Sequence, residues 1–272
     1  MNIKQTIKWL INSSVSNLGL EIRRKTVTDS VNRQTLLGSL QNIKKLGFEP
    51  KTVIDVGAAA GTFQLYETFP NAKHILIEPL EENKPYLEKI VSQYKDCEYL
   101  IAVATKTPGT AVLNVHPDLE GSSLYLECED SNVNGSPRTV PAIALDDICL
   151  DRNYQSPYLI KIDVQGAELD VLAGATEILK QTEYVILEVV LFEFFKNGPQ
   201  FYDTIDFMKQ RGFVVYDILD YWYRPLDNAM SQVDIAFVKE SGQFRKYHFY
   251  ATKEQREVQN ALLLSGRSTS QN

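Results

Sequence analysis

The sequence has few cysteines, no long hydrophobic run and no excess of positive charge. The three cysteines, Cys97, Cys128 and Cys149, are an odd number without metal-ligand spacing, which excludes a disulfide framework and a zinc ribbon and predicts reduced thiols in a cytoplasmic protein. The most hydrophobic stretch, 184–195, is interrupted by two glutamates and is shorter than the roughly 18 residues that a membrane span requires. The formal net charge is −7, which argues against a nucleic-acid partner.

Short apolar runs alternate with helical patterns along most of the 272 residues. We expect strands at 51–56, 73–77, 99–103, 158–164, 184–189, 213–218 and 233–238. Apolar residues at helical spacing lie between several of them, in 87–94, 169–179 and 201–208. Continuous apolar strands separated by amphipathic helices are typical of a parallel sheet covered on both faces. The sequence therefore predicts an α/β fold with one seven-stranded, mostly parallel sheet.

Three segments depart from this alternation. Residues 105–144 carry glycine, proline and asparagine between short β-like pieces, which predicts a small β insertion of hairpins or a lid. At the N-terminus, apolar residues at helical spacing among basic ones predict an amphipathic helix. It would dock on the core or on a sister subunit of a homo-oligomer, or make weak peripheral contact with a membrane. We thus expect an N-terminal helical extension over 1–40, the main domain over 41–240, and a C-terminal helix and flexible tail over 241–272.

A turn of small residues follows the first predicted strand. Gly57, Ala58 and Gly61 lie in this turn, where a ligand can approach the backbone closely. The second strand ends at Glu78, 21 residues beyond Gly57, where a carboxylate can accept hydrogen bonds from both ribose hydroxyls. This pattern indicates an adenosine-containing cofactor. It does not separate NAD from S-adenosylmethionine, because both carry such a ribose.

Two residues favour S-adenosylmethionine. A dinucleotide fingerprint has its second glycine where this chain has Ala59, whose methyl group would crowd a pyrophosphate. Asp55 precedes the turn, where its charge would repel a diphosphate but can hold the ammonium group of a methionine moiety, directly or through water.

Six sequence blocks resemble, in order, the signatures of the FkbM family of S-adenosylmethionine-dependent methyltransferases. They are Val53–Gly61, Ile77–Pro79, Gly121–Leu124, Leu145–Asp147, Ile160–Glu168 with Val171–Gly174, and Gln232–Asp234. The resemblance runs over residues 50–240 and implies a Rossmann-like class I methyltransferase fold whose last strand is antiparallel. It also implies methyl transfer from S-adenosylmethionine, usually to a hydroxyl of a small-molecule or glycan acceptor such as a sugar or a secondary metabolite.

The same resemblance implies roles for single residues in binding the cofactor. The methionine and ribose region would be lined by Asp55, Gly57, Ala58 and Gly61, the ribose hydroxyls bound by Glu78, and the adenine ring contacted by Ile101 and Ala102. Asp163 ends the fourth strand and would face the sulfonium or the substrate hydroxyl, unless it only caps the following helix. Glu168 is expected to be structural. The family pattern usually has glutamate where this chain has Gln165, which removes a charge from the site.

Acceptor binding and proton removal involve other residues. His116 is a possible general base because neutral imidazole titrates near physiological pH, but it also fits a surface loop. Ser122 and Ser123 would bind ligand or lid, or simply form a turn. Glu188 would contact a substrate hydroxyl; with Asp163 it makes only two acidic groups, so no metal is predicted.

Two other functions stay open from the residues alone. An NAD-dependent oxidoreductase acting on a sugar nucleotide shares the strand, turn and ribose carboxylate, although the chain lacks a Tyr-x-x-x-Lys pair at Tyr154 and Tyr158. A non-catalytic nucleoside-binding protein is the second alternative. The aromatic run Tyr221–Tyr223 fits either acceptor contacts or a subunit interface.

Overall fold

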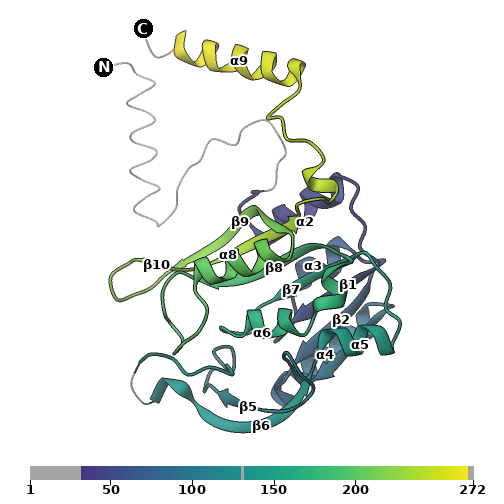
Figure 1. Ribbon diagram of the computed structural model, residues 1–272, viewed down its shortest axis with the longest axis vertical. Helices are drawn as coiled ribbons and strands as arrows, with labels where there is room; N and C mark the ends of the chain where they lie inside the picture. Colours follow the sequence, from purple (N-terminus) through teal and green to yellow (C-terminus); the bar gives the residue numbers. More distant parts are fainter. Residues whose placement is uncertain (1–31, 130–131, 269–272) are drawn as a thin grey trace. The chain divides into compact units, whose positions relative to one another are not determined.

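A seven-stranded sheet forms the centre of the molecule (Figure 1). The computed structural model describes residues 32–129 and 132–268, and the compact unit begins at Arg33. The strand order is β3-β2-β1-β7-β8-β10-β9, and β10 runs antiparallel to both of its neighbours. The strands are β1 (Thr52–Val56), β2 (Lys73–Glu78), β3 (Cys97–Ile101), β7 (Tyr158–Ile162), β8 (Thr182–Val190), β9 (Phe213–Tyr223) and β10 (Met230–Lys239). The predicted α/β fold with a mostly parallel sheet is confirmed.

Each predicted strand lies in this sheet, but the predicted end of the third at Val103 was wrong. The strand ends at Ile101, and the N–H of Ala102 donates to the carbonyl of Glu78 at 3.2 Å. Val103 then begins β4 in a separate sheet. An apolar run marks both pieces as strands, yet it carries no signal for the change of sheet between them.

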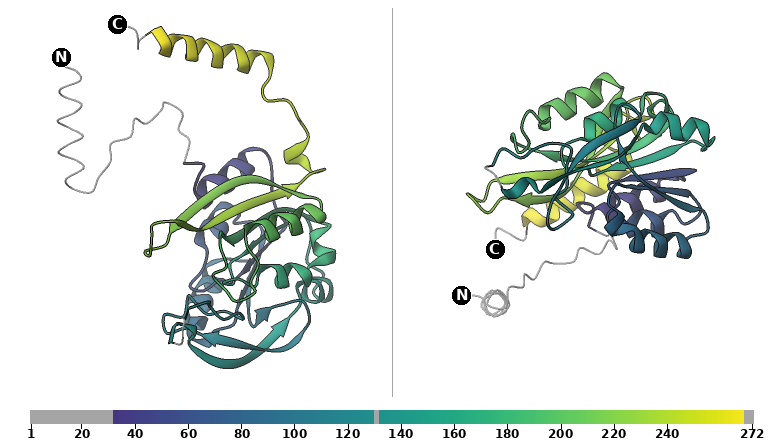
Figure 2. Two further views of the ribbon diagram at one scale, coloured as in Figure 1. Left: turned by 60° about the vertical axis from the view of Figure 1, so that its left-hand side comes forward. Right: turned by 90° about the horizontal axis from the view of Figure 1, so that it is seen from below.

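Helices cover both faces of the main sheet, as Figure 2 shows for α8 on one side and α2, α3 and α4 on the other. One face packs against α5 (Leu145–Asp151), α6 (Glu168–Ala173), α7 (Thr176–Leu179) and α8 (Phe201–Gln210). The opposite face packs against α2 (Leu36–Lys45), α3 (Phe63–Thr68) and α4 (Lys84–Gln93), the last preceded by η1 (Glu81–Asn83). Alternate residues of β1 enter the two cores, because successive strand side chains point to opposite faces.

The predicted β insertion forms a three-stranded sheet of its own, in the order β4-β6-β5. Its strands are β4 (Val103–Ala104), β5 (Gly109–Val115) and β6 (Ser136–Ile143), and η2 (Asn132–Asn134) precedes β6. Leu113 and Val140 of this sheet pack on Val103 and Leu80. The small sheet is thereby joined to the chain that follows β2, close to the carboxyl ends of the main strands.

The ends of the chain contribute little to this description. The predicted N-terminal amphipathic helix lies outside the described residues, and η3 (Gln243–Arg245) and α9 (Lys253–Ser268) follow β10. Between residues 32 and 268, apart from 130 and 131, no helix combines the length and the apolar character needed to cross a bilayer. The division at residues 40 and 240 stays a prediction.

Candidate functional site

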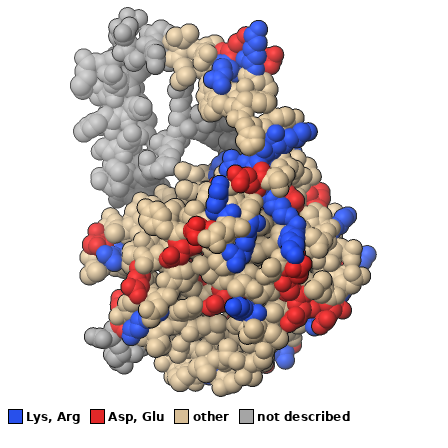
Figure 3. All heavy atoms as spheres, viewed as in Figure 1, with Lys and Arg blue, Asp and Glu red and all other residues tan. Residues whose placement is uncertain are grey.

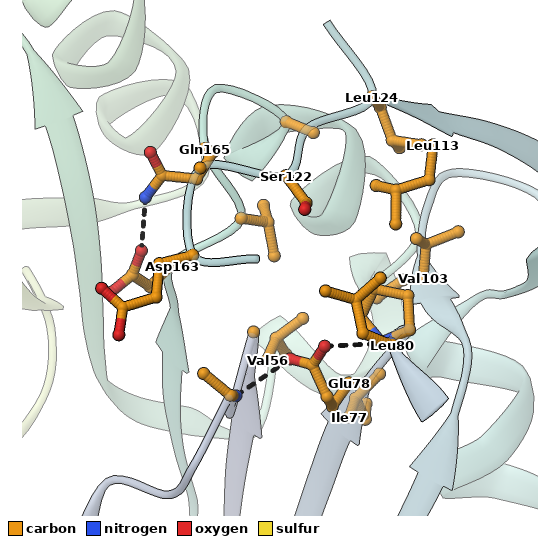
Figure 4. Close-up of a pocket in the computed structure, with 18 of the residues that line it drawn as sticks. Val56, Ile77, Glu78, Leu80, Val103, Leu113, Ser122, Leu124, Asp163 and Gln165 are labelled. Atoms are coloured by element: carbon orange, nitrogen blue, oxygen red, sulfur yellow. Dashed lines mark hydrogen bonds between the residues drawn. The ribbon is translucent and has the colours of Figure 1, made fainter. Parts of the chain in front are cut away.

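A cavity of about 410 Å³ lies at the carboxyl ends of the central strands, where the strand order reverses between β1 and β7. Ligands of open α/β sheets bind at such a switch point, and this volume lies in the usual range for small-molecule sites. Figure 4 shows Asp163 and Gln165 on one side of the cavity, Leu80, Val103, Leu113 and Leu124 on the other, and Glu78 below them.

The turn after β1 brings the backbone to the cavity without side chains in the way. Gly57 and Ala59 line the cavity and have left-handed backbone angles, with φ of 75° and 45°. A Cβ on Gly57 would lie 1.7 Å from the carbonyl oxygen of Asp163, and one on Gly61 would lie 2.3 Å from Cδ1 of Ile90. Close packing against backbone atoms therefore requires glycine at 57, and a φ of 106° favours glycine at 61. Gly61 and the buried Ala58 belong to this turn but do not line the cavity.

Asp55 is buried beneath this turn and does not line the cavity. Its carboxylate accepts hydrogen bonds from the Tyr66 hydroxyl at 2.5 Å and the Thr62 hydroxyl at 3.1 Å. Burial raises the pKa of Asp55, and the charge of Lys161 and these two hydroxyls oppose the shift. These hydrogen bonds tie the end of β1 to α3 and to the residue that precedes it. The expected contact of Asp55 with an ammonium group stays a prediction.

Glu78 lines the cavity at the end of β2 and is held by two backbone amides. Its carboxylate accepts hydrogen bonds from the N–H groups of Ala59 at 2.9 Å and Leu80 at 3.0 Å. Burial raises the pKa of Glu78, and the amide donors oppose that rise. Each oxygen keeps acceptor capacity for a further donor, as recognition of a ribose requires.

The side of the cavity beyond Glu78 is apolar. Leu80, Val103, Leu113, Leu119 and Leu124 line it, and they come from the chain after β2 and from the insertion. Ala102 also lines the cavity, whereas Ile101 does not. Of the two residues predicted to contact adenine, only Ala102 thus lies in the cavity wall, and the contact itself stays a prediction. The wider apolar surface comes from the insertion, for which the sequence analysis predicted no adenine contact.

Two carboxylates and two amides form the opposite side. Asp163 accepts hydrogen bonds from Lys161 Nζ at 3.0 Å and Gln165 Nε2 at 3.1 Å. Glu188 accepts from Gln165 Nε2 at 2.9 Å and Gln232 Nε2 at 2.6 Å. The amide group of Gln165 therefore bridges both carboxylates. A glutamate at this position would add a third negative charge in place of the two donated hydrogen bonds.

Lys161 is a residue of this site that the sequence reasoning missed. It lies in β7 with 7% of its surface exposed, and its backbone pairs with that of Asp55 in β1. Burial alone would lower the pKa of Lys161, but the carboxylates of Asp163, Asp55 and Asp234 raise it. The lysine thus stays charged beneath Asp163. A lysine inside an apolar buried strand was the available signal, because such a residue needs a charged partner.

Glu168, at the start of α6, supports the loop that carries Gln165. Its carboxylate accepts hydrogen bonds from the N–H groups of Val164 and Gly166, both at 3.1 Å. Burial raises the pKa of Glu168 to about 7, although these backbone donors oppose the rise. These contacts fit the structural role expected for Glu168.

The stability of the protein should therefore depend on pH through Glu168. The Glu168 carboxyl binds its proton more tightly in the folded state, where its pKa is about 7, than in the unfolded state, where its pKa is near 4.5. Protonation of Glu168 therefore stabilises the fold fully below pH 4.5, and this stabilisation is lost as the pH rises through about 7. Glu168→Gln removes the titration and keeps an acceptor oxygen. From pH 4.5 to pH 8, the unfolding free energy of the variant should rise relative to wild type by on the order of 3 kcal/mol in urea titrations.

The exposed Glu67→Gln in α3 provides the matched control and should follow wild type at every pH. Parallel curves for Glu168→Gln and wild type would contradict the assignment of this titration.

The insertion contributes one serine to the cavity wall, and a second serine binds the loop that carries Gln165. Ser122 lines the cavity, whereas Ser123 is buried and donates from Oγ to the carbonyl of Gln165 at 2.5 Å. His116 does not line the cavity, and its Nδ1 lies 2.7 Å from Oδ1 of Asp118. The structure therefore separates His116 from the two carboxylates at the other side of the site. Among the described residues, no group of three or more His, Cys, Asp or Glu side chains is arranged to hold a metal ion.

Comparison with known protein families identifies the family of this chain. The model of the methyltransferase FkbM domain matches residues 55–215, which is more than half of the chain. The chain belongs to the FkbM methyltransferase family. Its sheet, with the single antiparallel strand β10 next to the edge strand β9, is the Rossmann-like class I fold implied by the family resemblance.

Two named methyltransferases share shorter segments with this FkbM chain. The hexuronic acid methyltransferase AglP of Haloferax volcanii is 31% identical over 93 residues, which cover 31% of this chain and 38% of that protein. The 2-O-methyltransferase NoeI of Sinorhizobium fredii is 44% identical over 52 residues, which cover 19% of this chain and 21% of that protein. The matches thus span well under half the length of either relative.

Solved structures of other methyltransferases are similar at low identity. Precorrin-6y C5,15-methyltransferase of Geobacter metallireducens is 12% identical, with 79% of this chain and 93% of that chain covered and a TM-score of 0.40. The 1,6-didemethyltoxoflavin-N1-methyltransferase of Burkholderia thailandensis is 10% identical, with 88% and 91% covered and a TM-score of 0.41.

Proposed function

We propose that this protein transfers a methyl group from S-adenosylmethionine to a hydroxyl oxygen of a sugar, a glycan or a secondary metabolite. The observation that carries the proposal is one continuous cavity with two chemically different sides. Glu78 and the apolar residues around Leu80 suit an adenosine. The Asp163–Glu188 pair, bridged by Gln165, suits a reacting hydroxyl.

The lining fits the charge and shape of S-adenosylmethionine. Gly57 presents only backbone atoms to the cavity, and Glu78 keeps acceptor capacity for ribose hydroxyls. Four carboxylates line the cavity, from Glu78, Glu120, Asp163 and Glu188. No Lys, Arg or His side chain is in the lining among the described residues. A pyrophosphate would find no cation there, which favours S-adenosylmethionine over NAD and weakens the oxidoreductase alternative.

We assign proton removal to Glu188 and not to His116. When bound, S-adenosylmethionine supplies an electrophilic methyl group, whose bond to sulfur breaks with its electron pair kept by sulfur as the acceptor oxygen bonds to the carbon. Glu188 lines the cavity and takes the hydroxyl proton, and Gln165 and Gln232 hold its carboxylate in place. Lys161 donates a hydrogen bond to Asp163 at 3.0 Å and holds this second carboxylate in the cavity wall, where it would interact with the positive charge of a bound cofactor.

The named relatives support an oxygen acceptor on a sugar. One is named for hexuronic acid methylation and the other for methylation of a 2-oxygen. A carboxylate able to take a proton is what an alcohol acceptor requires, because the oxygen loses its proton as the new bond forms.

Calorimetric titration of the full-length protein tests the cofactor. Saturable binding of S-adenosylmethionine and S-adenosylhomocysteine, without binding of NAD, is the expected result. Binding of NAD alone would overturn the proposal in favour of the oxidoreductase alternative. Methyl transfer is then followed with a labelled methyl group and a panel of sugar and metabolite acceptors; tight cofactor binding without transfer to any of them would favour the non-catalytic alternative.

Substituting the ribose-binding carboxylate gives a direct prediction. Glu78→Ala should weaken S-adenosylmethionine binding about 100-fold, because two hydrogen bonds to a charged acceptor are each worth about 1.5 kcal/mol or more. Glu81→Ala is the matched control, since Glu81 is exposed three residues further on and lies outside the cavity wall. Unchanged affinity in Glu78→Ala, measured by the same titration, would contradict the assignment.

A further inference from the structure

An aromatic side chain lies next to the carboxylates, on the outer side of the cavity. Trp222 of β9 pairs with Gln232 of β10 in register, and Gln232 donates to Glu188 of β8 at 2.6 Å. Directly paired residues point to the same face of a sheet. Three neighbouring strands thus bring an indole ring, an amide and a carboxylate into one row, and all three side chains line the cavity.

Trp222 is 48% exposed although it belongs to the cavity wall. A half-exposed indole beside a polar cavity offers a flat apolar surface to a ligand that enters from solvent. The C–H face of a sugar ring matches such a surface, and ring hydroxyls match the Glu188 oxygens and the neighbouring amides. A few convergent polar groups beside an aromatic wall are typical of small-molecule sites.

The charges around this row select against anions. Carboxylates supply all the formal charge of the described lining. Two cations next to lining residues, Lys161 and Arg224, are each paired with a carboxylate. Lys161 is buried beneath Asp163 at 3.0 Å. Arg224, two residues beyond Trp222, binds Asp227 with two hydrogen bonds of 2.6 and 2.7 Å. A carboxylate or phosphate on the acceptor would therefore meet like charge without a free counter-ion.

The sheet that covers the cavity adds little charge. Arg138 is the one charged residue in the sequences of β5 and β6, and it binds Glu82. Figure 3 shows that Lys and Arg gather with Asp and Glu in the upper part of the viewed face, whereas the lower end, which carries β5 and β6, is mostly uncharged. Arg138 is paired, and no cation from the described part of the insertion lines the cavity.

We propose that Trp222, Gln232 and Glu188 form an acceptor subsite for an uncharged sugar ring and that the carboxylate-lined cavity excludes uronic acids and sugar phosphates. This inference rests on the proposed function and narrows its substrate class. It also separates this chain from the relative named for a hexuronic acid.

Matched pairs of glycosides test the inference by binding. Methyl glucoside, mannoside and galactoside are each compared with the corresponding uronic acid on full-length protein saturated with S-adenosylhomocysteine, by ligand-observed NMR titration. At least one neutral member should bind, and at least tenfold more tightly than its acid. Equal or tighter binding of the acids would overturn the inference, and so would binding of no glycoside. Either result leaves the proposed function standing, because that function fails on other results: no binding of S-adenosylhomocysteine and S-adenosylmethionine, or cofactor binding without methyl transfer to any acceptor.

Substitutions at Trp222 and Gln232 test whether these side chains bind the acceptor, apart from any effect on folding or on cofactor binding. Trp222→Ala should weaken binding of the neutral glycoside at least tenfold without changing the affinity for S-adenosylhomocysteine, whereas Tyr223→Ala, at an exposed neighbour outside the cavity wall, should change neither. Gln232→Lys places a cation beside Glu188 and should shift the preference towards the uronic acid at least tenfold. Unchanged sugar binding in Trp222→Ala, or an unchanged preference in Gln232→Lys, would contradict the assignment.

Discussion

Replacing Gly57 with alanine should abolish S-adenosylmethionine binding and lower the free energy of unfolding by about 3 kcal/mol or more. The new Cβ would lie 1.7 Å from the carbonyl oxygen of Asp163 and 2.8 Å from its carbonyl carbon. Both are backbone atoms at the end of β7, so no side-chain rotation relieves the overlap. The turn after β1 or the end of β7 must move, and either shift displaces groups that line the cavity. Urea unfolding and calorimetric titration measure the two effects.

Gly47→Ala separates steric overlap from backbone strain. Gly47 has a φ of 88°, similar to the 75° of Gly57, but a Cβ there would meet nothing within 4 Å. This control should lose only about 1 kcal/mol, the cost of a left-handed conformation in a residue with a Cβ, and should bind the cofactor normally. Equal effects of the two variants would mean that strain, and not the contact with Asp163, accounts for the loss.

Glu188→Gln should lower the rate of methyl transfer by about 100-fold to 10,000-fold while cofactor affinity stays within about threefold. The variant keeps the shape of the side chain and cannot take a proton. Its effect should appear in kcat, because the proton leaves as the new bond forms and not when substrate binds.

The pH profile gives a second measure of the same role. Burial raises the pKa of Glu188 well above its usual value, and the negative charges of Asp163, Glu168 and Asp234 add to the rise while Lys161 opposes it. A base must be ionised to act, so the wild-type rate should fall as the pH drops through this raised pKa. Glu188→Gln should lack that acid limb.

Glu193→Gln makes the same chemical change at an exposed residue shortly after β8 and should leave rate and pH profile unchanged. A Glu188→Gln enzyme that keeps a rate within threefold of wild type would place proton removal at another group. Asp163→Asn in the same assay then tests its carboxylate neighbour.

Local signals explain why the fold could be predicted from the sequence. The apolar runs of β1, β2 and β7 are continuous because both faces of these strands are covered, and the helical patterns between them match α4 and α8. The turn at Gly57 and the carboxylate at Glu78 follow strand ends directly, and parallel strands bring their carboxyl ends to one edge. Both residues line the cavity for that reason.

Side-chain hydrogen bonds that depend on the folded geometry explain what could not be predicted. The hydrogen bond from the Tyr66 hydroxyl of α3 to Asp55 was not predicted, and the contact of Asp55 with an ammonium group stays a prediction. His116 was predicted as a possible general base or as a histidine of a surface loop, and its Nδ1 lies 2.7 Å from Oδ1 of Asp118, outside the cavity wall. Ser123 reaches the carbonyl of Gln165 across 42 positions of sequence. None of these partners has a fixed spacing that a sequence pattern would reveal.

By itself, the sequence determined the mostly parallel sheet, the turn of small residues after β1 and the family, since these depend on short motifs and on a pattern of apolar residues that repeats along the chain. Only the tertiary structure decided that Lys161 lies under Asp163, that Gln165 bridges two carboxylates, and that Trp222 joins them from β9. The physical reason is that charge pairing and hydrogen bonding act between side chains a few ångströms apart, and the fold alone brings distant residues to such distances.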